Sequence, residues 1–304
     1  MKKVLVIAGP TATGKTALSV RLAKELGGEV ISADSVQIYR QLDIGSAKPT
    51  TDEMDGVPHH MMDFLDPRAG FSVADFCALA KQKIDEIHAR GKLPIIAGGT
   101  GLYISSLVNN ISFLEEKTEN TVRQRLYEEL ENLGAENLHQ RLFEVDPDAA
   151  KTIHPNNTKR VVRALEIYET TGKTMTEQNL ASKATPSPYD FILCALSCER
   201  ELLYERIDKR VEIMVSQGLF EEVSKLLKTV PADAQSMQGI GYKEAVQYIN
   251  GTITKEESIA LIQKNSRNYA KRQLTWFRRE NYQWFDALSD ALYDTVKTYV
   301  GENL

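Results

Sequence analysis

The feature that most constrains this chain is a glycine-rich segment near its start, G-P-T-A-T-G-K-T at residues 9–16. It follows an apolar, β-branched run at residues 4–8 and precedes residues 18–26, whose apolar positions have helical spacing. Strand, turn and helix in this order fit the G-x-x-x-x-G-K-S/T pattern, in which backbone N–H groups surround a phosphate at a helix N-terminus. We call this segment the phosphate loop and expect it to bind a ligand with at least two phosphates, through Gly9, Pro10, Thr11, Ala12, Thr13, Gly14, Lys15 and Thr16.

Two side chains of the phosphate loop have separate expected roles. Lys15 would reach terminal phosphate oxygens, and Thr16 would offer its hydroxyl to Mg²⁺. Mg²⁺ keeps several waters and takes further ligands from phosphate oxygens, so a single protein hydroxyl is sufficient. The sequence therefore predicts Mg²⁺ as cofactor, with Thr16 as the metal ligand. The loop alone does not distinguish ATP from another diphosphate.

Further apolar runs define the expected fold. Runs at 30–33 and 93–97 read as strands, with a helical pattern at Val73–Ala89 between them, and 191–198 reads as a fourth strand. Strands that alternate with helices indicate a parallel sheet. We predict an α/β, P-loop NTPase-like core with a parallel sheet flanked by helices, interrupted by an all-helical insertion domain. The expected boundaries are 1–114 and 186–304 for the core and 115–185 for the insertion.

Composition excludes several classes of protein. The 304 residues contain 37 Lys+Arg and 42 Asp+Glu, a net charge of −5, and 42% are hydrophobic. These values are typical of a water-soluble globular protein and not of a disordered chain or a basic protein that coats nucleic acid. No run approaches the roughly 18 apolar residues of a membrane span, and no signal peptide is expected. Three cysteines without nearby histidines indicate a reduced, cytoplasmic protein, and no obligate protein partner is evident.

Asp34 and Thr100 lie just past the ends of two of the expected strands. Ligands of open parallel sheets bind outside the carboxyl ends of the strands, so both side chains should face the phosphate loop. Asp34 could serve as a general base, as a group that binds a metal ion indirectly through one of the ion's ligands, or as a group that recognises a substrate hydroxyl or amine. The alternative is that Asp34 caps a turn and that Thr100 belongs to a glycine turn.

Basic residues form three groups along the chain. Arg206 and Arg210 lie four residues apart, on one helix face, where they could hold a leaving diphosphate or simply be solvated. In a long helix opened by the Thr254–Glu257 capping box and running to about residue 279, residues 264–279 lack Asp and Glu. The basic stripe of this helix consists of Lys264, Arg267, Lys271 and Arg278, and a smaller basic cluster in the insertion consists of Lys159, Arg160 and Arg163. Both groups favour a nucleic acid partner over a solvated face.

Two aromatic or histidine pairs have structural interpretations. Trp276 and Phe277 could stack on a base, but we favour packing against the core. Adjacent His59 and His60 diverge and lack a third ligand at metal-site spacing, so we interpret them as structural or positioning residues.

Taken together, the motifs resemble the tRNA dimethylallyltransferase (tRNA isopentenyltransferase) family over nearly the whole chain. They are the phosphate loop, ISADSVQIY at 31–39, DIGSAKP at 43–49, PHH at 58–60, GGTGLY at 98–103, IHPN at 153–156, GIGYK at 239–243 and RQLTWF at 272–277. The eukaryotic C-terminal zinc finger is missing, so the chain resembles the bacterial form. Gln41 and Ser46 replace the usual Gly and Thr, which puts the local backbone there in doubt.

The resemblance implies a reaction and its partners. The family transfers a dimethylallyl group from dimethylallyl diphosphate to the exocyclic amine of the adenine just 3′ of the anticodon, with Mg²⁺. Asp34 would accept the amine proton, Thr100 would contact the base, and Arg206 or Arg210 would assist the leaving diphosphate. The tRNA anticodon stem-loop would be contacted by Asp34, Ser35, Val36, Gln37, Lys159, Arg160, Arg163, Gln238, Gly241, Tyr242 and Lys243, in addition to the basic stripe.

Two other classes of protein share parts of this pattern. A small-molecule kinase uses the same loop, an Asp after the second strand and arginines over the phosphates. A nucleotide-dependent RNA-binding module without chemistry would also combine the loop with a basic surface. Transfer of a prenyl group to RNA would distinguish a tRNA dimethylallyltransferase from the kinase and from the RNA-binding module.

Overall fold

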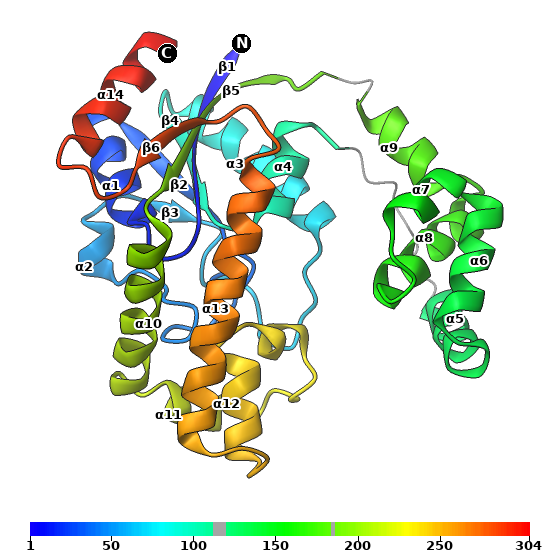
Figure 1. Cartoon of the computed structure of the whole chain (residues 1–304). Helices are drawn as coiled ribbons and strands as arrows, with labels where there is room; N and C mark the ends of the chain where they lie inside the picture. Colours follow the sequence, from blue (N-terminus) through cyan, green and yellow to red (C-terminus); the bar gives the residue numbers. More distant parts are fainter. Residues whose placement is uncertain (112–119, 184–185) are drawn as a thin grey trace. The chain divides into compact units, whose positions relative to one another are not determined.

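The computed structural model describes residues 1–111, 120–183 and 186–304. They form two compact units, Met1–Leu107 with Pro188–Leu304 and Val108–Ser187, which we call the core unit and the helical unit. Figure 1 shows the elements of both. The expected boundaries between residues 114 and 115 and between 185 and 186 lie outside or at the edge of the described residues.

The core unit is built on a parallel sheet of six strands in the order β3-β2-β4-β1-β5-β6. Val6 of the central strand β1 is in register with Ile96 on one side and Leu193 on the other. This confirms the predicted α/β class. The strands are β1 (Lys2–Ala8), β2 (Gly28–Ala33), β3 (His59–His60), β4 (Leu93–Gly98), β5 (Tyr189–Ser197) and β6 (Gln283–Asp286).

Helices cover both faces of the sheet. In Figure 1, α1 (Lys15–Leu26) and α14 (Leu292–Asn303) lie on one side, and α3 (Val73–Ala89) and α4 (Gly101–Val108) lie on the other. Apolar side chains of α1 and α14 pack on those of the central strands, in a buried cluster that includes Leu5, Ile7, Leu22, Leu196 and Val296. Burial on both faces explains why the central strands read as continuous apolar runs.

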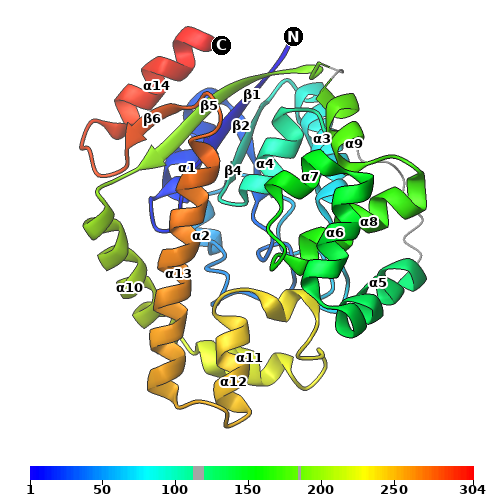
Figure 2. The same ribbon diagram turned by 45° about the vertical axis from the view of Figure 1, so that its right-hand side comes forward.

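The remaining helices of the core unit extend from the sheet edge that carries the phosphate loop. They are α2 (Thr51–Met54), α10 (Arg200–Ser216), α11 (Leu219–Leu226), α12 (Tyr242–Ile249), α13 (Lys255–Phe277) and a 3₁₀ turn at Gln235–Gln238. The predicted capping box at the start of α13 is present, with Glu257 N–H donating to Thr254 Oγ1 over 3.2 Å. Both views show α10 and α13 side by side, with α12 against α13 and α11 against α12 (Figures 1 and 2).

The two ends of the chain lie beside each other. The ammonium of Lys3 donates to the carbonyl of Asn303 over 2.5 Å, which joins β1 to the last turn of α14. None of the helices in the described parts of the chain is both long and apolar enough to cross a lipid bilayer.

The helical unit has an apolar core of its own, which includes Leu126, Leu142 and Leu165. The buried carboxylate of Glu166, 2% exposed, accepts from Arg123 and Arg163, each at 2.9 Å. The unit therefore has both a core and a buried ion-pair network. Its helices are α5 (Asn120–Leu133), α6 (Ala135–Val145), α7 (Pro147–Thr152), α8 (Thr158–Thr171) and α9 (Met175–Lys183).

Candidate active site

A cavity of about 1050 Å³ opens at the carboxyl ends of β1, β2 and β4, bounded on its other sides by α10, α12 and α13. This is the edge of a parallel sheet at which ligands bind. Many of the residues that the sequence singled out line it: Thr11, Ala12, Gly14, Lys15, Thr16, Asp34, Ser35, Val36, Gln37, Gln238, Gly241, Lys243 and Arg210.

The phosphate loop is held tightly against the sheet. A Cβ on Gly9, at φ +146°, would lie 2.7 Å from the carbonyl oxygen of Leu196 in β5, so only glycine fits. Gly14, at φ +81°, precedes the first turn of α1, where Leu18 N–H donates to the Gly14 carbonyl over 3.1 Å. The open N-terminus of α1 therefore points its free N–H groups into the cavity.

Lys15 lies over the phosphate loop, with its ammonium donating to the carbonyl of Pro10 over 2.7 Å. Burial, helped by the positive charge of Arg210 and opposed by Asp34, lowers the pKa of Lys15 to about 7. Neutralisation by a bound anion would restore the ordinary basicity of this amine. The site is therefore electrostatically prepared for phosphate groups.

Asp34 caps a turn and also lines the cavity, so its geometry is compatible with both roles that its sequence position allowed. Its Oδ1 accepts from the N–H groups of Val36 and Gln37, at 2.8 and 3.2 Å, which caps the turn after β2. Among the described contacts only Oδ1 has hydrogen-bond partners, so Oδ2 keeps its acceptor capacity inside the cavity. Thr100 supports the same turn, because its Oγ1 accepts from Ser35 N–H over 3.1 Å.

The structure separates the two arginines that the sequence left as alternatives. Arg210 is partly buried and lines the cavity, where burial lowers its pKa and the charge of Asp34 opposes that shift. Arg206 is exposed, and its Nε donates to the carbonyl of Ala12 over 2.8 Å. Arg206 therefore supports the phosphate loop from outside, and Arg210 shares the cavity with Lys15.

Sequence reasoning missed Gln273 and Tyr269, one turn apart on α13. Gln273, 5% exposed, accepts from Thr11 N–H over 3.0 Å and donates to the Gly99 carbonyl over 2.9 Å. Tyr269 lines the cavity, and burial, reinforced by the charge of Asp34, raises its pKa to about 12. The available signal was their spacing of four residues on a predicted helix.

The basic stripe on α13 differs from the expectation in one respect. Arg267 pairs with Asp208 of α10, so an acid from a neighbouring helix relieves the charge that looked unopposed in the sequence. Lys264 and Lys271 are exposed. A Cβ on Gly101 would lie 2.6 Å from the ring of Trp276, which confirms that Trp276 packs against the core.

Tyr242 is a correction to the expected tRNA contacts. The side chain is fully buried, and its hydroxyl donates to Glu222 Oε1 over 2.8 Å. A ring sealed inside the core cannot touch a macromolecule at the surface. Tyr242 is the buried first residue of α12, and its neighbours Gly241 and Lys243 line the cavity.

The smaller basic cluster belongs to the helical unit. Lys159 and Arg160 are exposed on the first turn of α8, whereas Arg163 is partly committed to Glu166.

His59 and His60 are accounted for within the core unit. His60 Nε2 lies 2.7 Å from Glu29 Oε2, which also accepts from Arg90, and His59 Nδ1 lies 2.9 Å from the carbonyl of Val57. Within the described ranges no three His, Cys, Asp or Glu side chains are grouped so as to hold a metal ion.

The fold and the cavity define a P-loop protein in which a carboxylate and the phosphate loop line one cavity. Residues 37–280 match the model of the IPP transferase family, and the chain belongs to that family. It is 50% identical over 294 residues to a tRNA dimethylallyltransferase of Halalkalibacterium halodurans, covering 96% of this chain and 93% of the relative. A second relative of that name, from Bacillus cytotoxicus, is 52% identical over 300 residues, covering 98% and 95% of the two chains.

Solved structures agree with the sequence relatives. The full-length tRNA isopentenylpyrophosphate transferase of Bacillus halodurans superposes with a TM-score of 0.75 at 46% identity, covering 99% of this chain and 96% of the other. A eukaryotic dimethylallyltransferase acting on tRNA gives a TM-score of 0.84 at 31% identity, covering 99% and 78%. These findings favour the prenyltransferase hypothesis over the kinase and the RNA-binding module.

Proposed function

We propose that this enzyme transfers the dimethylallyl group of dimethylallyl diphosphate to the exocyclic amine of the adenine 3′ of the anticodon in tRNA, and releases diphosphate. The observation that carries the proposal is the shared cavity: Asp34 and the pair Lys15 and Arg210 line the same space. A proton acceptor therefore lies opposite groups suited to a departing diphosphate. Because tRNA is the substrate, we expect the reaction to take place in the cytoplasm.

The leaving group determines half of the chemistry. As the bond between the allylic carbon and the diphosphate oxygen breaks, its electron pair moves onto the diphosphate. The phosphate-loop N–H groups, Lys15 and Arg210 stabilise that developing charge without reorganising. Arg210 is our choice for the assisting arginine, because Arg206 is exposed outside the cavity lining.

The acceptor side determines the other half. The adenine amine is a poor nucleophile because its lone pair is delocalised into the ring. As the new N–C bond forms, Asp34 Oδ2 takes the amine proton, while Oδ1 stays bonded to the turn that holds the carboxylate in place. The base must leave its stack to enter the cavity, which costs least in an unpaired anticodon loop.

A magnesium ion fits this donor set. Thr16 lines the cavity on the first turn of α1, next to Lys15, so its hydroxyl could ligate an ion that draws its other ligands from diphosphate and water. When bound, Mg²⁺ would neutralise charge on the diphosphate oxygens.

Candidate tRNA contacts are found in each unit taken by itself. In the core unit, the candidates are Ser35, Val36, Gln37, Gln238, Gly241 and Lys243 at the cavity and Lys264 and Lys271 on α13. Lys159 and Arg160 are the candidates in the helical unit. Each Lys or Arg that contacts a phosphate should add about one unit to the salt dependence of binding.

One assay tests the proposal. The protein is incubated with Mg²⁺, dimethylallyl diphosphate and a tRNA that carries an unmodified adenine 3′ of the anticodon. The RNA is then digested, and the masses of its nucleosides are measured by mass spectrometry. We expect a five-carbon gain on that adenosine. A kinase-like product, or RNA that binds and keeps its mass, would overturn the proposal.

A further inference from the structure

We propose that Glu222 of α11 is a positioning residue for prenyl transfer, because it fixes residues 43–47 as the cavity wall that joins the acceptor side to the leaving-group side. The inference rests on the proposed function and adds to it a residue outside the phosphate loop and outside the sequence motifs. We call residues 43–47 the wall loop; all five line the cavity.

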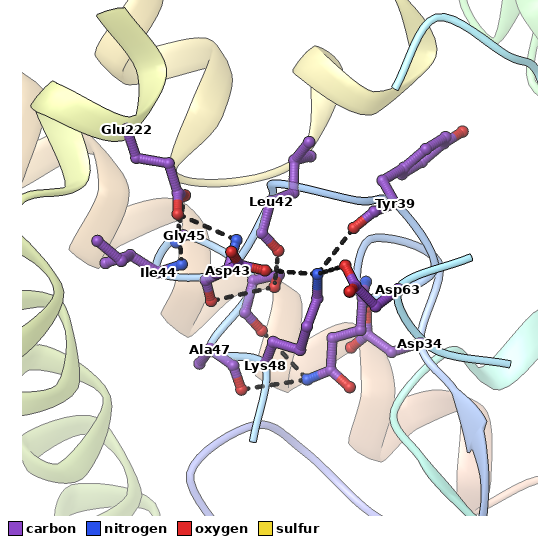
Figure 3. Close-up of polar contacts among 12 residues, drawn as sticks. Asp34, Tyr39, Leu42, Asp43, Ile44, Gly45, Ala47, Lys48, Asp63 and Glu222 are labelled. Atoms are coloured by element: carbon purple, nitrogen blue, oxygen red, sulfur yellow. Dashed lines mark hydrogen bonds and ion pairs between the residues drawn. The ribbon is translucent and has the colours of Figure 1, made fainter. Parts of the chain in front are cut away.

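The carboxylate of Glu222 holds the backbone of the wall loop directly. Its Oε2 accepts from the N–H groups of Asp43 and Ile44, at 3.0 and 2.7 Å, and its Oε1 accepts from Gly45 N–H over 3.1 Å (Figure 3). Three successive N–H groups that converge on one anion form an anion-binding nest. Bonds to an ionised acceptor are about twice as strong as neutral ones, so this contact fixes the loop firmly.

Tyr242 reinforces the contact between Glu222 and the wall loop through its hydroxyl group. Its hydroxyl donates to Glu222 Oε1 over 2.8 Å and accepts from Ser46 N–H over 3.1 Å. A Cβ on Gly45 would lie 2.6 Å from the tyrosine ring, so the loop backbone rests directly on the aromatic face. The buried Tyr242 side chain thus supports the wall loop and does not make the predicted contact with tRNA.

The other edge of the wall loop is tied to the acceptor side. Gln37, which follows Asp34 in the same turn, donates from Nε2 to the carbonyls of Ser46 and Ala47, both at 3.2 Å. Just beyond the loop, Lys48 donates to the Tyr39 carbonyl over 2.8 Å and pairs with Asp43 at 2.6 Å and Asp63 at 2.7 Å (Figure 3).

The leaving-group side meets the wall loop at the same point. The guanidinium of Arg210 approaches the Ala47 carbonyl at 3.4 Å, the carbonyl that also accepts from Gln37. A shift of the loop would therefore displace the turn that carries Asp34 and the arginine over the diphosphate together. Misplacement of about 1 Å can cost a factor of about 100 in rate.

The packing of α11 does not depend on this carboxylate. The helix buries Leu219, Phe220, Val223 and Leu226 against the core unit, while Glu222 is only partly buried. Four of the hydrogen bonds that Glu222 accepts go to the wall loop and Tyr242. Changing the carboxylate should therefore leave the helix folded and release the loop.

The test compares Glu222→Gln with Glu221→Gln. An amide oxygen can replace one carboxylate oxygen, but its NH₂ group would face N–H donors, so about half of the nest is lost. Glu221 is the adjacent, exposed carboxylate on α11 and has no hydrogen bond among those described, so it is the matched control. Tyr242→Phe removes only the hydroxyl link and serves as a milder variant.

We expect kcat for prenyl transfer to fall about tenfold or more in Glu222→Gln and less in Tyr242→Phe. The affinity for inorganic pyrophosphate, measured by calorimetry, should weaken by at most about threefold, because the phosphate loop and Lys15 still hold the anion and only its contact with Arg210 is disturbed. Glu221→Gln should match the unsubstituted protein in both measurements.

Other outcomes would overturn the inference. An unchanged kcat in Glu222→Gln would show that the wall loop holds without the carboxylate. Parallel losses of kcat, pyrophosphate affinity and melting temperature would show a role in stability alone. Failure of the proposed function is distinguishable, since the unsubstituted protein would then add no prenyl group to tRNA.

Discussion

In the proposed reaction, the two oxygens of the Asp34 carboxylate have separate roles, one structural and one chemical. Oδ1 accepts from two backbone N–H groups and fixes the turn after β2, which leaves Oδ2 for a substrate proton. An aspartate held in this way presents its second oxygen with little loss of side-chain entropy. Capping and catalysis are therefore compatible roles at this position.

The two roles predict different results for two substitutions. Asp34→Asn keeps an oxygen for the turn but loses the proton acceptor, so prenyl transfer should fall by a factor of about 100 to 10,000. Pyrophosphate binding should change little. Asp34→Ala should lose transfer and also loosen the turn, seen as faster hydrogen exchange at Val36 and Gln37. Transfer at the unsubstituted rate in Asp34→Asn would contradict the assignment.

Lys15 predicts a specific pH dependence. With its pKa at about 7, the free lysine is largely neutral at pH 8. A bound diphosphate favours the charged form and raises that pKa, so binding at pH 8 should take up close to one proton, and affinity should weaken as pH rises above 7. Calorimetry in two buffers of different ionisation enthalpy measures the uptake.

Lys15→Arg provides the control for this measurement. Arginine stays charged over the whole range, so its proton uptake reports only the titration of the ligand itself. Equal uptake by the two proteins would show that Lys15 does not titrate on binding.

At the scale of elements, α13 serves the site on one face and the surface on another. Gln273 faces inward and joins the phosphate loop to the segment after β4, whereas Lys264 and Lys271 are exposed. The helix is thus a structural link between the two loops as well as a candidate tRNA surface.

Gln273→Ala should affect both loops. It leaves the N–H of Thr11 and the carbonyl of Gly99 without their partner, at a cost to stability of about 1–3 kcal/mol. We also expect weaker binding of pyrophosphate, because the phosphate loop loses a support. Gln263→Ala, on the same helix but away from the loop, should change neither quantity. Denaturant unfolding and calorimetry provide the two measurements, and unaltered pyrophosphate affinity would refute the proposed link.

Sequence patterns predicted the elements that periodicity can reveal. The four long strands and α3 emerged because continuous burial makes them apolar runs and helical spacing marks one face. Strands β3 and β6 were missed because two and four residues are too short to show a pattern. They form the outer edges of the sheet.

At the site, the sequence could predict only those residues that belong to local patterns. Gly14, Lys15 and Asp34 belong to a local motif or to a strand end, so their shared location followed from the fold class, whereas the choice of Arg210 over Arg206 required the structure. Glu222 and Gln273 act across 177 and 262 residues of chain, on Gly45 and Thr11, and no local pattern encodes such pairings. The relief of Arg267 by Asp208, on another helix, was invisible for the same reason.

At the scale of the whole molecule, the helical unit has its own means of stabilisation. Burial alone would raise the pKa of Glu166, but its bonds to Arg123 and Arg163 outweigh burial and lower that pKa. A depressed carboxyl pKa adds stability above the ordinary value of 4.5, and this stability is lost as pH falls through the folded value.

Glu166→Ala should therefore destabilise the helical unit and spare the core unit. Loss of the shared carboxylate should cost about 1–3 kcal/mol, below the full value for a buried pair because both arginines are partly exposed. Hydrogen exchange should accelerate in α5 and α8 and stay unchanged in β1 and β4. Glu131→Ala, which changes an exposed acid of α5, is the control. Equal acceleration in β1 would show that the two units unfold together.

The close fit of Gly9 against Leu196 has a consequence for how the protein is made. The phosphate loop lies at residues 9–16, yet its supports are Leu196 in β5 and Gln273 in α13. A ribosome must therefore synthesise the chain through both supports before this loop can adopt its final form. Nascent chains that end before residue 273 should lack the bond between Gln273 and Thr11, so we expect them to bind pyrophosphate more weakly than chains that include α13.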